Sequence, residues 1–323
     1  MQQADGARHP PVSVLRGLRD NMDTEYFFRL FFSGLTRGSI YALLALGYTM
    51  VYGIIKLINF AHGEIYMIGA FIALIMSGVF SIMGMPTLAI LVLASLVAVV
   101  YSSAYGYTVE KLAYKPLRRA PRLSVLIGAI GMSLFLQNYV LLSQTSNFLP
   151  FPSMLPTLRI PGPFQGLMNS SQLVIFITTA IVMVILTILI KFTKMGKSMR
   201  ATSQDRTMAT LVGINVNRVI SWTFIIGSFT AALGGILISS FIGQINFYIG
   251  FIAGIKAFVA AVLGGIGSVP GAVLGSLVLG MAEAYAAGYI SSQYEDVFAF
   301  IILVFILIFK PSGLLGKPEV QKV

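Results

Sequence analysis

Five polar or ionisable side chains stand beside or within long apolar runs. Asn59, His62 and Glu64 fall between two such runs, and Lys256 and Glu283 lie inside two later ones. A charged group at the centre of a bilayer costs at least roughly 2.5 kcal/mol, so it should face a protein interior or a water-filled cavity. These five residues are therefore the candidates for lining a path across a membrane.

Each of these groups also has a structural interpretation. His62 and Glu64 could cap the following helix at the membrane interface, where a carboxylate is favoured near a helix N-terminus. Lys256 and Glu283 could form an ion pair between two helices that only holds the bundle together. The residues alone leave both alternatives open.

The sequence contains no residue pattern that indicates catalysis or cofactor binding. The chain has no cysteine, and its two histidines, His9 and His62, are far apart and form no metal-binding motif. Met195–Ser198 matches the end of a phosphate-binding loop, but Lys191 stands where that pattern needs its first glycine. We expect no catalytic residue, no metal, no cofactor and no ATPase site of its own.

The elements that must position these residues are membrane-spanning helices. Hydrophobic residues make up 57% of the 323-residue chain and charged residues only 10%, whereas soluble domains contain about 25% charged residues. A spanning helix needs about 20 mostly apolar residues. This rule predicts an all-α, polytopic bundle of eight or nine spans. The count is eight if either the first or the seventh apolar run does not cross. The nine runs are Gly38–Ile55, Glu64–Met83, Pro86–Tyr107, Leu123–Leu142, Gln172–Ile190, Val219–Phe241, Gly250–Gly267, Ala272–Ile290 and Val297–Phe309.

The net charge of +11 is concentrated in two loops. One follows the third run (residues 110–122) and the other follows the fifth (191–218), and the positive-inside rule places both in the cytoplasm. If both the seventh and the eighth runs cross, the tail (312–323) is cytoplasmic too. The N-terminus then lies outside if the first run crosses once, and inside if Tyr26–Ile55 forms a hairpin or re-entrant element.

The chain divides into three parts. Residues 1–25 hold no apolar run and are predicted to be a mobile surface segment without a cleavable signal peptide. Residues 26–311 form the transmembrane domain, and residues 312–323 form the tail. The basic charge suits a membrane surface, and we expect no nucleic-acid partner.

Two interruptions of the apolar pattern allow more than one interpretation. In the loop 196–217, Ala201, Met208, Ala209, Leu211 and Val212 can form one apolar stripe of a short helix that Gly213 stops. That helix could lie on the membrane or dock into a partner's groove. The glycine-rich segment 264–271 and the small residues Gly271, Gly275 and Gly280 on the next helix could pack helices closely. The segment could also form a broken element along a path.

The order of several motifs resembles one family of membrane proteins. The segments Tyr48–Ile55 (YTMVYGII) and Ile58–Gly69 (INFAHGEIYMIG) are similar to the signature of LivH-type permeases, the membrane subunits of bacterial branched-chain amino-acid ABC importers. The similarity continues through 130–139, 256–268 and 311–320. It covers most of the chain from about Gly34, and the first 25 residues lie outside it.

The resemblance implies a transport subunit in the bacterial inner membrane, without its own ATPase activity. Its partners would be a second homologous permease, two cytoplasmic ATP-binding subunits, a periplasmic amino-acid-binding protein and membrane lipid. The cytoplasmic loop would then couple the chain to the ATPases through residues similar to the coupling motif of ABC permeases: Arg200, Ala201, Asp205, Ala209 and Gly213. The leading acidic residue of that motif is not obvious here, and Arg200 stands nearby instead.

Other functions fit the same scaffold. A related permease could carry urea, short amides or polar amino acids. A proton- or sodium-coupled transporter or channel could use Glu64, Lys256 and Glu283 as relays. A membrane-embedded enzyme is disfavoured because no catalytic constellation is present.

Overall fold

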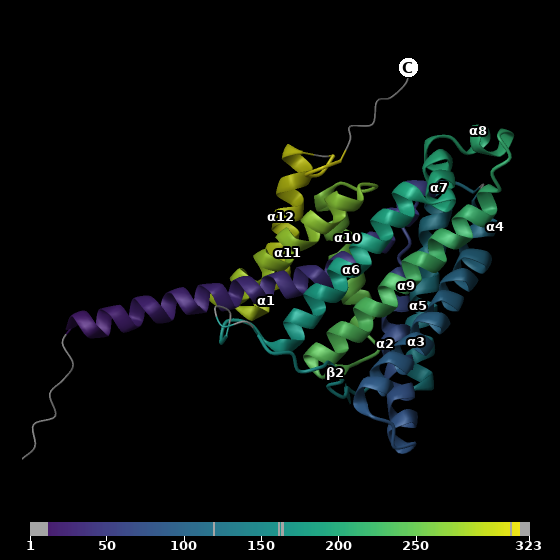
Figure 1. Cartoon of the computed structure of the whole chain (residues 1–323). Coiled ribbons are helices and arrows are strands. Elements are labelled where there is room, and N and C mark those ends of the chain that lie inside the picture. The colour runs from purple at the N-terminus through teal and green to yellow at the C-terminus, as the bar shows by residue number, and fades with distance from the viewer. Residues whose placement is uncertain (1–11, 119, 161, 163–164, 311, 317–323) are drawn as a thin grey trace, which may run out of the picture.

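The computed structural model describes residues 12–118, 120–160, 162, 165–310 and 312–316, and it is almost entirely helical (Figure 1). Among these residues, eight helices are long and apolar enough to cross a membrane. The prediction of an all-α polytopic bundle is therefore confirmed. The long helices are α1 (Val12–Ile55), α2 (His62–Ile82), α3 (Thr87–Val109), α5 (Arg122–Ser143), α6 (Ser170–Phe192), α9 (Val216–Ile242), α11 (Val269–Tyr289) and α12 (Glu295–Phe309). The last of these reaches a spanning length of 18 residues together with the turn Ser292–Tyr294 that precedes it.

Shorter elements connect the long helices. A π-helical turn, η1 (Glu110–Tyr114), and α4 (Lys115–Leu117) extend α3. The strands β1 (Leu149–Pro150) and β2 (Gln244–Ile245) pair antiparallel, with Leu149 opposite Ile245. The remaining elements are α7 (Lys194–Gln204), α8 (Arg206–Leu211), α10 (Ile249–Gly264) and the 3-10 turn η3 (Ser292–Tyr294).

The first apolar run is part of one continuous helix. Since α1 runs without interruption from Val12 to Ile55, the alternative of a hairpin or re-entrant element over Tyr26–Ile55 is wrong. The first turns of α1 extend away from the bundle (Figure 1). The predicted segment 1–25 therefore overlaps this helix from Val12 onward, its residues 1–11 lie outside the described residues, and its mobility stays a prediction.

The seventh apolar run forms a helix that is shorter than a full span. α10 has 16 residues, which is about 24 Å of helix against a hydrocarbon core of about 30 Å. After Gly264 the chain turns through Gly265, whose φ of +103° favours glycine, and α11 begins at Val269. Leu314 and Leu315 donate backbone hydrogen bonds of 2.9 Å to the carbonyls of Leu263 and Gly264, so the tail covers this turn.

Small residues allow the central helices to approach closely. α1 packs along α11, and a Cβ built on Gly280 would lie only 2.3 Å from the backbone nitrogen of Gly38. A Cβ on Gly275 would lie 2.2 Å from the carbonyl oxygen of Ala260. The predicted packing through small residues is therefore confirmed between these helices.

The basic loops gather on one face of the bundle. Arg118 of the first loop donates a 2.5 Å hydrogen bond to Asn217 of the second. Arg206 of the second loop reaches the carbonyl of Ile54, at the end of α1. In Figure 1, α4, α7 and α8 lie at the upper end, while the β2 strand lies at the opposite end. This arrangement agrees with the expected cytoplasmic side.

Candidate functional site

The start of α2 lies inside the bundle and not at its edge. The rings of Tyr48 and His62 are 4.8 Å apart between centroids, and a Cβ built on Gly47 would lie 2.3 Å from His62 Nε2. Because α1 continues for about two more turns to Ile55, the connection 56–61 must fold back along it. α2 therefore begins inside the helix bundle, beside the last two turns of α1.

His62 and Glu64 are buried there, with exposed fractions of 2% and 0%. Glu64 lies in the first turn of α2, where a carboxylate is favoured. Its burial shows that the carboxylate lies inside the bundle, and both its capping role and its role in a path stay predictions. Ser133 of α5 donates a 3.0 Å hydrogen bond to Glu64 Oε1. Within the described residues, neither Glu64 Oε2 nor His62 Nε2 has a hydrogen-bond partner.

The N-terminal ends of α2 and α10 meet beside this carboxylate. A Cβ on Gly63 would lie 2.2 Å from the carbonyl oxygen of Gly250 and 2.9 Å from the Cα of Gly254. A Cβ on Gly250 would lie 2.7 Å from Glu64 Oε2. The glycines thus bring two helix N-termini, each with partial positive charge, next to Glu64.

Asn59 holds the connection 56–61 against η1 through a hydrogen bond. The hydroxyl of Tyr114 donates to Asn59 Oδ1 at 3.0 Å and is 3.3 Å from the carbonyl of Ile58. Asn59 is 2% exposed. Its contacts hold the connection in place, so of the three residues near the start of α2, Asn59 is the one with a clear structural role.

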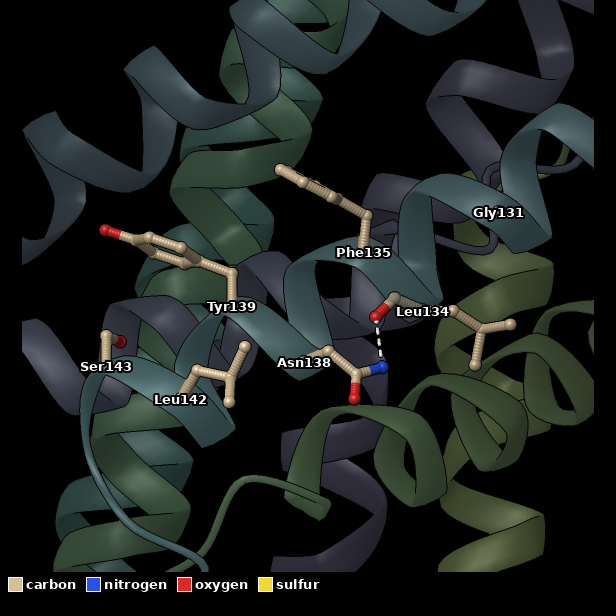
Figure 2. A pocket seen from close by; sticks show the side chains of 7 residues that line it. All are labelled: Gly131, Leu134, Phe135, Asn138, Tyr139, Leu142 and Ser143. Carbon is tan, nitrogen blue, oxygen red and sulfur yellow. Dashed lines mark hydrogen bonds between the residues drawn. The ribbon is translucent and has the colours of Figure 1, made fainter.

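A small cavity adjoins the Glu64–Ser133 pair, and a larger groove lies outside it. The groove, 580 Å³ in volume, runs along α5 past Gly131, Leu134, Asn138 and Leu142 (Figure 2). Leu134 also lines the cavity of 40 Å³, so this side chain stands between the two spaces. The cavity is lined by Tyr48, Phe60, Ile130, Ser133, Leu134, Phe251, Gly254 and Ile255.

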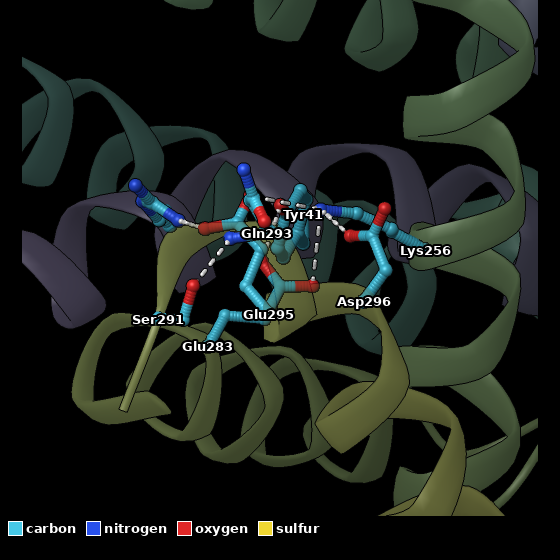
Figure 3. A network of polar contacts seen from close by, with 8 residues as sticks. Tyr41, Lys256, Glu283, Ser291, Gln293, Glu295 and Asp296 are labelled. Carbon is cyan, nitrogen blue, oxygen red and sulfur yellow. Dashed lines mark hydrogen bonds and ion pairs between the residues drawn. The ribbon is translucent and has the colours of Figure 1, made fainter. Parts of the chain in front are cut away.

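Lys256 and Glu283 form a second, separate cluster. Lys256 Nζ lies 3.4 Å from Glu283 Oε1, 3.7 Å from Glu295 and 2.6 Å from Asp296 (Figure 3). Tyr41 donates a 2.7 Å hydrogen bond to Glu283 Oε2. The structure therefore bears out the expectation of an ion pair between helices.

This cluster ties four helices together. Arg37 of α1 bonds Glu295 at 2.7 Å, Lys256 belongs to α10, Glu283 to α11, and Glu295 begins α12. The sequence candidates thus divide between two places: Asn59, His62 and Glu64 at the start of α2, and the pair Lys256 and Glu283 in this cluster.

The loop 196–217 folds as two helices and not as one. Asp205 interrupts the run because its carboxylate accepts hydrogen bonds from the backbone amides of Thr207 and Met208, at 2.8 and 3.0 Å. These bonds cap α8. The prediction of one short helix that carries Ala201 through Val212 is therefore wrong, because capping at Asp205 starts a new helix.

The predicted apolar stripe is split in consequence. Ala209 is buried and Ala201 is half-buried, but Met208, Leu211 and Val212 are 61%, 75% and 75% exposed. Gly213 ends α8 with a φ of +83°, as predicted. The three exposed apolar side chains form what we call the α8 face.

Arginines anchor this loop to the spanning helices. Arg206 donates to the carbonyl of Ile54 through Nη2 at 2.9 Å and Nε at 3.3 Å. Burial and the nearby Arg118 lower the pKa of Arg206 from its ordinary value. Arg200 donates to the carbonyls of Ile190 and Lys191 at the end of α6. A movement of α7 and α8 would therefore be transmitted to α1 and α6.

Sequence reasoning missed several partners in these sites. Ser133 lies 69 positions from Glu64 and resembles any small residue of a spanning helix. Glu295 and Asp296 were placed before the last span, although paired acids are typical of a first helical turn. No group of His, Asp or Glu that could hold a metal ion occurs within the part of the chain that the structure describes.

Comparison with known proteins connects this arrangement to one family. Residues 30–307 match the family model described as "Branched-chain amino acid transport system / permease component". The chain is 50% identical to the "High-affinity branched-chain amino acid transport system permease protein LivH" of Salmonella typhimurium, over 92% of this chain and 98% of that protein. It is 49% identical to the corresponding permease protein BraD of Pseudomonas aeruginosa, over the same shares of the two chains.

More distant proteins resemble the chain less closely. A "Probable branched-chain amino acid transport permease protein LivH" of Methanocaldococcus jannaschii is 28% identical over 86% of this chain and 89% of that protein. The solved structure "PsaBC from Streptococcus pneumoniae in complex with Fab" covers 90% of this chain and 92% of its own at 12% identity, with a TM-score of 0.40, which is too low to support an argument. The family match and the near-complete coverage at 50% identity show that this multi-pass membrane protein belongs to the LivH-type branched-chain amino-acid permeases.

Proposed function

We propose that the chain is a permease subunit of an ATP-driven importer in the bacterial inner membrane and forms half of a translocation path for branched-chain amino acids. The observation that carries this proposal is the 50% identity, over 92% of the chain, to relatives named as high-affinity branched-chain amino acid transport permeases. The substrate class comes from those names. The buried polar groups at the start of α2 provide candidate path residues in this chain.

The remaining parts of the importer would be separate proteins. A second homologous permease would complete the path, a periplasmic binding protein would deliver the amino acid, and two cytoplasmic subunits would bind and hydrolyse ATP. We infer that the ATP-binding subunits contact the α8 face, because Met208, Leu211 and Val212 lie exposed on the basic side of the bundle. Exposed apolar side chains of this kind are the contacts through which an amphipathic helix binds in a hydrophobic groove of its partner.

In this mechanism, ATP binding would draw the two ATP-binding subunits together and move α7 and α8. Arg206 would pass that movement to α1 through Ile54, and Arg200 would pass it to α6. The spans would then alternate between outward and inward access. The chain would supply the path and the lever, while its partners would hydrolyse ATP.

The test is retention of the ATP-binding subunits on membranes that contain the permease pair. Replacing the three residues of the α8 face by serine should reduce retention about tenfold, because apolar anchors are lost from the contact. The matched control keeps size and apolarity: Met208→Leu, Leu211→Met and Val212→Ile. Equal retention of both triple variants would contradict the proposed contact, and ATP hydrolysis by the purified chain alone would contradict the division of labour.

A further inference from the structure

The carboxylate of Glu64 is the least compensated buried group in the candidate path. Its exposed fraction is 0%, and Ser133 bonds only one of its two oxygens. Within the described residues Oε2 has no hydrogen-bond partner. Burying an ionised carboxylate with one neutral partner is unfavourable, so the group either takes up a proton or is stabilised when a positive charge approaches it.

The positive charges nearby are only partial. The N-terminal ends of α2 and α10 face the carboxylate across Gly63 and Gly250, which offsets part of its charge. Lys256, on the same helix as Gly250, is already engaged by Glu283, Glu295 and Asp296. A full cation that pairs with Glu64 would therefore come from outside the chain.

The space next to Glu64 suits an apolar molecule that carries such a cation. Ser133 lines the cavity with its hydroxyl bonded to Glu64. The remaining walls are mostly aromatic and aliphatic, with Phe60, Ile130 and Ile255 among them. A small hydrophobic amino acid matches this lining. Its charged ammonium end would lie beside Ser133, and its branched apolar side chain would lie against these walls.

The cavity is small, and it lies beside a larger space. Its 40 Å³ suffices for about one water molecule. Leu134 separates it from the 580 Å³ groove along α5 (Figure 2). Displacement of Leu134 would join the two spaces, so the path would run along α5 and past the Glu64–Ser133 pair.

We propose that Glu64 and Ser133 form the subsite that receives the α-ammonium group of the transported amino acid, while Ile130 and the neighbouring apolar walls receive its branched side chain. The inference rests on the proposed function and adds to it the residues that contact the substrate and select it. It gives this permease some selectivity beyond that of the binding protein.

The test is uptake of radiolabelled leucine and valine into liposomes that contain the permease pair, with binding protein outside and ATP inside. Glu64→Gln preserves shape but removes charge. It should lower uptake about tenfold or more, the scale of a charged hydrogen bond, while the permease pair still assembles with its partners. Glu25→Gln is the matched control, because Glu25 forms an exposed pair with Arg29, and it should transport normally.

Specificity offers a second, independent readout. Ile130→Phe should fill the cavity and lower leucine uptake about threefold more than valine uptake. The same binding protein delivers both substrates in every variant, so a changed ratio reports on the permease. An equal loss for the two amino acids would contradict the role of Ile130.

Three results would overturn the subsite. The first is normal uptake by Glu64→Gln. The second is loss of subunit assembly or of basal ATP hydrolysis in Glu64→Gln, together with normal uptake by Ser133→Ala. The third is wild-type uptake that fails when the proton gradient is collapsed, because Glu64 would then carry a proton. Wild-type liposomes that take up no leucine with ATP would instead refute the proposed function itself, and the subsite with it.

Discussion

Removing the ammonium of Lys256 tests whether its cluster is a structural clamp. The cluster contains two cations, Arg37 and Lys256, and three carboxylates, Glu283, Glu295 and Asp296. Its net charge is therefore −1, and Lys256→Met changes it to −2. Glu283 would keep the hydrogen bond from Tyr41 but would lose its nearest cation.

The expected cost follows from burial. Glu283 is 0% exposed and the Lys256 side chain is 10% exposed, and breaking a buried pair from one side costs about 3–5 kcal/mol. Asp296 is 54% exposed, so Asp296→Asn should cost no more than about 1 kcal/mol. Lys256→Met combined with Glu283→Gln should recover much of the loss, because no uncompensated charge remains.

The assay is denaturant unfolding in mixed micelles, followed by the fluorescence of Trp222, the single tryptophan. The free energy of unfolding should fall by several kcal/mol for Lys256→Met and by far less for Asp296→Asn. Equal small effects of the two single variants would refute the assignment of a buried clamp. So would a double variant that is less stable than Lys256→Met alone.

Two further predictions concern packing and coupling. Gly280→Ala should destabilise the bundle by about 1–3 kcal/mol, since its Cβ would collide with Gly38. Gly78→Ala, where the added methyl meets nothing within 4 Å, should be neutral or stabilising in the same unfolding assay, and similar losses at both positions would contradict the packing argument. Arg206→Ala removes the bonds to Ile54 and should reduce uptake several-fold while ATP hydrolysis continues, as should Gly213→Ala, which strains a positive φ; normal uptake in both variants would remove the coupling assignment.

The sequence predicted those features that depend on local composition. Apolar length located the spans, and lysines and arginines located the basic face, because both signals are carried by consecutive residues. The start of α2 was beyond such reasoning. Nothing local reveals that residues 56–61 fold back against Gly47 and Tyr48 and so bury His62 and Glu64.

Partners far apart in the chain were also beyond prediction. An ion pair between Lys256 and Glu283 was one of two alternatives for these residues. Asp296, which was placed outside the last span, makes the shortest contact to Lys256. Asp205 lies within the stretch predicted to form one short helix, whereas its side chain caps a new helix. Capping competes with helix continuation, and the period alone does not show which prevails.

We propose that this chain moves branched-chain amino acids with energy from ATP. The most direct measurement compares leucine uptake into liposomes containing the permease pair, the ATP-binding subunits and the binding protein. One sample has ATP inside and no ion gradient, and the other has a proton or sodium gradient and no ATP. Uptake should occur only in the sample with ATP. Uptake driven by the gradient alone would contradict the proposal of an ATP-driven importer.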